Sequence, residues 1–272
     1  MRDHQSIFTA IVSSISARSA AREEAGAIAT NEAAPYTPRQ SGSFVRFAPE
    51  AFAAGRRPAG LRERDYIGKN TTARFFAKLT ELASASALAY ETLRDELAHY
   101  GAPTGLLRRL EVARRDEIRH ARALTRVARK FGGRALVPEV VRTANRRTLA
   151  EIARENASEG CVIESYRTIV TLLQSTNASD ADVARIMKKI ATDKTRHADL
   201  SWAINDWLMT KLSSSEIEAS EIAMRTAIAD LGNATFDVDA ELAGVAGLPS
   251  SAACAHIARA FGRELFGQDR AA

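Results

Sequence analysis

The chain has 272 residues, a formal net charge of +5 and hydrophobic residues at 46% of its positions. A chain of this length can bury a full core. Its net charge is modest and it has no block of Lys and Arg interleaved with aromatics, which argues against nucleic-acid binding. No apolar run reaches the ~18 residues that a membrane-spanning helix needs.

Residues 1–64 are predicted to form an arm or linker. Apolar residues at helical spacing over 7–15 indicate a short amphipathic helix, and an arm of this kind could dock a partner. Prolines and glycines then interrupt the segment at Pro35, Pro38, Gly55, Pro58 and Gly60. The start lacks the continuous apolar stretch of an ordinary secretory signal, so we expect a cytoplasmic protein.

Four long helices are predicted over residues 70–99, 103–130, 143–175 and 180–211 from the spacing of apolar residues. Gly101 and Pro103 separate the first two helices, and capping residues at 177–180 separate the last two. A helix of 28 residues is about 42 Å long, and an extended connection over 132–142 spans roughly 36–40 Å. The pattern therefore predicts an all-α fold over residues 65–211, with two antiparallel hairpins joined by a long crossover.

Residues 212–272 are predicted to be a C-terminal helical extension that packs on this bundle. One helix follows the capping residues at 213–216 and ends near Leu231, and another begins at 249–251. The stretch between them is polar and contains Gly232 and Asp237, so we expect it to be a connection.

A short motif occurs twice in the predicted bundle, as DEIRHA at 116–121 and as DKTRHA at 193–198. The first copy places Glu117 and His120 three residues apart, on one face of a helix. The second copy keeps His197 but has Lys194 in the place of the glutamate. Glu164 and Lys194 lie equally far from the turn near residue 179, so the two side chains are predicted to lie at one level.

With these motifs the chain resembles ferritin-like di-iron carboxylate proteins of the rubrerythrin and bacterioferritin type, and most closely bacterial ferritin-like domain proteins. The resemblance rests on DEIRHA at 116–121, EGCVIE at 159–164 and DKTRHADLSW at 193–202, and it extends to the segment 240–266. It implies a four-helix bundle with a metal site at its centre. The motifs are more specific for the fold than for an activity.

The resemblance also implies roles for individual residues. Four residues match metal ligands of the family, and two match acids that orient the histidines. These are Glu117, His120, Glu164 and His197 for the metal, and Asp116 and Asp193 for the histidines. Two positions depart from the family pattern, since Ala83 and Lys194 stand where the family has glutamates.

Three interpretations of this reduced site remain open. In one, a single iron or manganese ion is held by Glu164, His197 and Glu117, with His120 as a further ligand. In another, no metal binds, and the ammonium of Lys194 neutralises the buried carboxylates. In the third, a dinuclear site uses a substitute ligand such as Glu159 or Glu81.

Two classes of function follow from these interpretations. A mononuclear site predicts a metal-dependent oxidoreductase that uses dioxygen or peroxide. A metal-free site predicts a helical scaffold that binds a protein partner through its arm or its C-terminal helices. A homodimer is compatible with either class.

Overall fold

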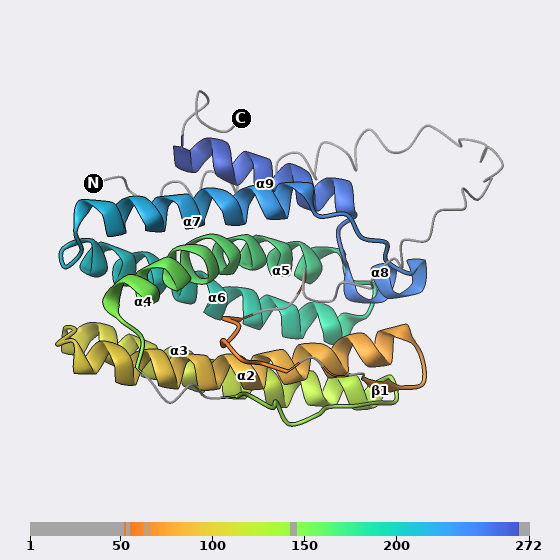
Figure 1. Cartoon of the computed structure of the whole chain (residues 1–272). Coiled ribbons are helices and arrows are strands. Elements are labelled where there is room, and N and C mark those ends of the chain that lie inside the picture. The colour runs from red at the N-terminus through yellow and green to blue at the C-terminus, as the bar shows by residue number, and fades with distance from the viewer. Residues whose placement is uncertain (1–51, 53–54, 63, 65, 142–145, 267–272) are drawn as a thin grey trace.

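The structure is a computed structural model that describes residues 52, 55–62, 64, 66–141 and 146–266. The described part is all-α apart from two strands of two residues each. The helices form three layers, with α2 and α3 in one, α5 and α6 in the next, and α7 and α9 in the outermost (Figure 1). No helix in the described ranges is long and apolar enough to cross a membrane.

The first hairpin consists of α2 (Thr71–His99) and α3 (Thr104–Lys130), within one residue of the predicted bounds. The side chain of Asn70 caps α2 by accepting a 2.8 Å hydrogen bond from the backbone N–H of Ala73. Gly101 has a φ of +74°, in the left-handed region, and so allows the tight reversal between the two helices.

The second hairpin contains α4 (Leu149–Glu155), the π-helix η2 (Asn156–Glu164), α5 (Ser165–Asn177) and α6 (Ala181–Met209). Only the bounds of α6 and the end of α5 agree with the prediction to within about two residues. These elements were predicted from apolar spacing alone, which does not distinguish a π-helical turn from an α-helical one.

The predicted start of this hairpin at residue 143 is wrong, because α4 begins at Leu149. Thr148 and Glu151 form a capping box there, in which each side chain bonds the other residue's backbone N–H. The preceding residue, Arg147, is held by Glu96 on α2 at 2.6 and 3.0 Å. This ion pair joins the residue before the cap to α2.

The segment before α2 and the connection after α3 run antiparallel to each other. Strand β1 (Ile67–Gly68) pairs with β2 (Gly133–Arg134), and Leu61 pairs with Val140 in the same register. Phe52 and Arg56 are buried, so the end of the predicted linker is packed into the molecule. The predicted amphipathic helix over 7–15 lies outside the described residues.

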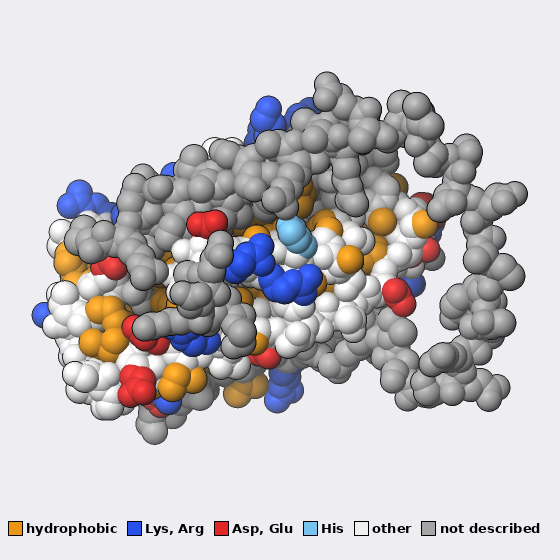
Figure 2. Space-filling model, turned by 90° about the horizontal axis from the view of Figure 1, so that it is seen from above, with side chains coloured by type: hydrophobic (Ala, Val, Ile, Leu, Met, Phe, Trp, Pro, Cys, Tyr) orange, Lys and Arg blue, Asp and Glu red, His pale blue; other side chains and the backbone are white. Residues whose placement is uncertain are grey.

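The C-terminal extension covers the second hairpin, as α7 (Ser214–Asn233), α8 (Ala240–Ala246) and α9 (Ser251–Phe266). Helix α8 was not predicted, because its seven residues are too few for a periodic pattern. It is capped by Asp239 and ends at Gly247, where φ is +62°. The view onto the α9 side shows basic, acidic and hydrophobic side chains interspersed (Figure 2).

Two apolar clusters fill the interior, one on each side of a polar level. Along α3, Ala113 belongs to one cluster and Ala121 to the other. The polar residues between them, Asp116, Glu117 and His120, are also buried. The candidate site therefore lies in the middle of the core, where a charge is costly unless it is paired.

Candidate functional site

A lysine ammonium group lies between two carboxylates at this polar level. Nζ of Lys194 is 2.5 Å from Oε1 of Glu117 and 2.8 Å from Oε1 of Glu164. All three side chains are at most 1% exposed. The three residues come from α6, α3 and the end of η2, so the ion pairs tie the two hairpins together.

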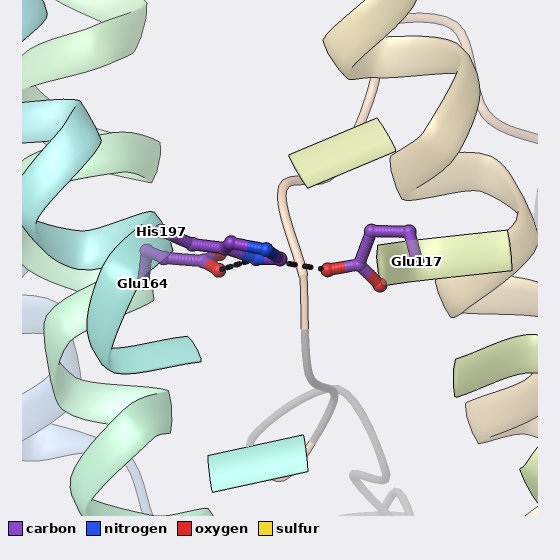
Figure 3. A group of neighbouring side chains, drawn as sticks. All are labelled: Glu117, Glu164 and His197. Atoms are coloured by element: carbon purple, nitrogen blue, oxygen red, sulfur yellow. Dashed lines mark ion pairs between the residues drawn. The ribbon is translucent and has the colours of Figure 1, made fainter. Parts of the chain in front are cut away.

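His197 approaches the same two carboxylates. Its Nδ1 lies 3.3 Å from Oε1 of Glu117 and 3.6 Å from Oε1 of Glu164. Figure 3 shows His197 and Glu164 entering from one side and Glu117 from the other, with their polar ends meeting. These three residues offer ligand atoms that all lie within 4.8 Å of one another.

Each aspartate of the repeated motif holds the histidine of the other copy. Nε2 of His197 lies 3.1 Å from Asp116, and Nε2 of His120 lies 2.9 Å from Asp193. These aspartates were expected to orient the histidines. Each aspartate–histidine pair joins α3 to α6. In both rings this leaves Nδ1 facing inward, with Nδ1 of His120 at 3.5 Å from Glu117.

Two arginines cover the aspartates on the outside. Arg196 bonds Asp193 at 2.5 Å and Asp116 at 3.2 Å, and Arg119 bonds Asp116. Both arginine side chains are more than half exposed, whereas Asp116 is 1% exposed. The network therefore runs from solvent, through the aspartates and histidines, to the buried carboxylates.

The positive and negative groups of this cluster stabilise one another's charged forms. Burial raises the pKa of Glu164, but Lys194 and then His197 outweigh this effect and lower the pKa to about 2. Burial lowers the pKa of His197, but the hydrogen bond with Asp116 and the nearby carboxylates of Glu117 and Glu164 raise it to about 10. The pKa of Lys194 is also raised, because Glu117 and Glu164 outweigh its desolvation. At neutral pH Lys194 and His197 then both carry a positive charge beside the carboxylates of Glu117 and Glu164.

Helix α2 also contributes Ser86 and Tyr90 to the site. The ring of Tyr90 lies 5.3 Å from that of His197, edge to face. The hydroxyls of Ser86 and Tyr90 are buried and form no hydrogen bond with any residue that the structure describes. The same is true of Nδ1 in both histidines and of one oxygen each in Glu117 and Glu164.

The dipeptide Gly55-Arg56, from the predicted linker, closes the site on the side of α2. A Cβ on Gly55 would lie 2.6 Å from the hydroxyl of Ser86 and 3.3 Å from Glu117. The guanidinium of Arg56 bonds Glu155 at 2.8 Å and Asn156 at 2.6 Å. Neither residue was predicted to belong to the site, because periodicity and motif spacing report nothing about an irregular segment.

The substitute ligands considered for a dinuclear site are bound elsewhere. Glu81 is buried but bonds Arg64 and the hydroxyl of Tyr66. Glu159 accepts a hydrogen bond from the backbone N–H of Arg57 and lies 3.6 Å from Arg167. Ala83 is buried and brings no ligand atom from α2.

As arranged, the donor set fits an ammonium group better than a metal ion. Iron and manganese need oxygen and imidazole ligands with free lone pairs. Lys194 uses one oxygen of each carboxylate, and His197 offers its Nδ1 as a ligand only when it has lost its proton. A metal ion bound by Glu117 and Glu164 would have to share these carboxylates with the ammonium group, whose positive charge repels it.

We compared the chain with protein-family models, with curated proteins and with solved structures. None of the three comparisons gave a match.

Proposed function

We propose that this chain is a ferritin-like four-helix bundle in which Lys194 takes the place of the metal, and that it serves as a binding scaffold rather than a redox enzyme. The observation that carries the proposal is the position of Nζ, at 2.5 and 2.8 Å from two fully buried carboxylates. The ferritin-like architecture is supported by two hairpins with a long connection between α3 and α4, and by the motif copies on α3 and α6.

Charge balance supports a permanent role for the lysine. Without a cation, Glu117 and Glu164 would be two buried negative charges at one level of the core, an arrangement that costs several kcal/mol. An ammonium group supplied by the protein removes this cost without a cofactor. Glu117 and Glu164 then serve to join the two hairpins, and a redox role for them is not needed.

Metal content per chain tests the proposal. We expect protein expressed with iron and manganese supplied to carry neither metal above background, and we expect Lys194→Glu to raise metal occupancy. Lys194→Gln is the matched control, because glutamine has the shape of glutamate but no carboxylate. About one ion per wild-type chain, lost on Glu164→Ala, would overturn the proposal.

A mononuclear iron or manganese site is the second candidate, and the inward-facing Nδ1 atoms favour it. A metal-binding histidine usually donates its other ring N–H to a carboxylate, as His197 and His120 do here. Glu117, Glu164 and His197 would hold the ion, which would supply oxygen or peroxide chemistry when bound. Oxygen consumption in the presence of a reductant, abolished by Glu164→Ala, would favour this candidate.

A further inference from the structure

A groove of about 330 Å³ lies on the surface of the molecule. It is formed by residues 56–59, by α2, by residues 140–141 and 146–147, and by the end of α4. Its lining includes four arginines and an apolar wall to which Leu88 and Val140 belong. These arginines are Arg56, Arg57, Arg146 and Arg147. Such a volume and mixture of side chains are typical of small-molecule sites.

The acids of the groove already have partners. Arg147 forms a two-point ion pair with Glu96, and Arg56 pairs with Glu155. The third acid, Asp95, is bound by Arg94, which lies outside the lining. Arg146 is exposed and forms no ion pair with a residue that the structure describes. The groove therefore has an excess of positive charge.

Arg56 places a desolvated guanidinium at the inner side of the groove. It is 2% exposed, and its Nη atoms bond Glu155 and Asn156. Its Nε is buried and donates no hydrogen bond within the described part of the chain. An unused donor in a buried arginine favours an anionic acceptor, because charge-assisted hydrogen bonds are the stronger ones.

Helix η2 makes room for this arginine. A Cβ at position 160 would lie 2.3 Å from Nη2 of Arg56, and Gly160 has no side chain to clash. The ring of Tyr90 lies 6.0 Å from the guanidinium carbon on the other side. Arg56 therefore has a fixed place between α2 and η2, which makes it a preorganised part of the groove.

We propose that this groove binds a small amphipathic carboxylate. The carboxylate lies among the arginines, and the apolar body lies against the wall that contains Leu88 and Val140. An inorganic anion would leave this wall without a partner, and a neutral molecule would leave the excess charge unmatched. The proposal stands independently of the role assigned to Lys194.

Isothermal titration calorimetry on the full chain tests the proposal, with octanoate, octanamide and inorganic phosphate as probes. Octanoate is expected to bind at least about tenfold more tightly than octanamide, which corresponds to one charge-assisted hydrogen bond. Phosphate is expected to give no measurable heat. Absence of octanoate binding, equal binding of octanamide, or binding of phosphate as tight as that of octanoate would each overturn the proposal.

Variants locate the binding in the groove. Arg146→Gln is expected to weaken octanoate binding about tenfold, and it should not affect folding because Arg146 is exposed. Arg108→Gln, at an exposed position on α3 outside the groove, is the matched control and should leave binding unchanged. Equal affinities in the two variants would mean that octanoate binds elsewhere, which would also overturn the proposal.

Discussion

Two lysines of this chain make the same kind of contact in opposite environments. Lys194 binds Glu117 and Glu164 at 2.5 and 2.8 Å with no exposed surface. Lys130 binds Asp180 and Asp182 at 2.8 and 2.9 Å, but its side chain is 43% exposed. From the distances alone, the two lysines would be expected to contribute almost equally to stability.

Their burial makes them different. Around Lys130, water can solvate whichever charge loses its partner, so an exposed pair adds little stability. Around Lys194, the apolar clusters exclude water, and a carboxylate left alone keeps its full desolvation penalty. We therefore expect the buried pair to be hard to remove and the exposed pair to be easy to remove.

The largest effect is expected from Lys194→Met. This change removes the ammonium group and leaves His197 as the cation beside two buried carboxylates, and we expect the free energy of unfolding to fall by about 3–5 kcal/mol. Urea denaturation measures it. Lys130→Met is the matched control and should have little effect. Similar losses of stability in the two variants would show that burial does not distinguish the two ion pairs.

The next effect is the dependence of stability on pH, which is measured on protein stripped of metal by a chelator. The pKa of Glu164 falls from 4.5 to about 2 on folding, so its contribution to stability is present above pH 4.5 and lost towards pH 2. The pKa of His197 rises from 6.5 to about 10, so its contribution is present below pH 6.5 and lost towards pH 10. Thermal unfolding should show greatest stability between pH 4.5 and 6.5.

His197→Gln tests this assignment of the alkaline side. The variant should lose less stability than the wild type between pH 6.5 and 10, because the proton of His197 is no longer there to be released. His256→Gln, at an exposed position on α9, should keep the wild-type profile. An unchanged profile in His197→Gln would show that another group causes the alkaline loss.

A smaller effect is expected from Gly160→Ala. The new methyl group would lie 2.3 Å from the guanidinium of Arg56, and overpacking of this kind costs about 1–3 kcal/mol. Gly105→Ala on α3 meets no atom within 4 Å and should be neutral or stabilising, since alanine favours helices. Chemical denaturation of both variants would show whether Arg56 is fixed as described.

The smallest effect is expected from Arg196→Gln. Arg196 contacts Asp193 and Asp116, but its side chain is 53% exposed. The free energy of unfolding should fall by less than about 1 kcal/mol, as urea denaturation would show. A loss as large as that for Lys194→Met would mean that the outer part of the network is as critical as its centre.

The sequence predicted the long helices because their ends carry local signals. Asn70 and Asp180 cap α2 and α6, and Gly101 permits the first reversal. The motif copies likewise predicted that Glu117, Glu164 and His197 would meet, since helical periodicity and equal distance from a turn set their level. The missed helix α8 has too few residues for a periodic pattern, and the start of α4 is set by the capping box of Thr148 and Glu151, which apolar spacing does not report.

By itself, then, the sequence determined an all-α chain with paired acids, histidines and a lysine at one level. Only the tertiary structure decided which atoms meet: the crossed pairing of Asp116 with His197, and the burial of Arg56 beside η2. The physical reason is that periodicity specifies the face on which a side chain lies, whereas its partners depend on how the helices pack. A residue in an irregular segment, such as Arg56, has no periodicity at all, so only packing could place it.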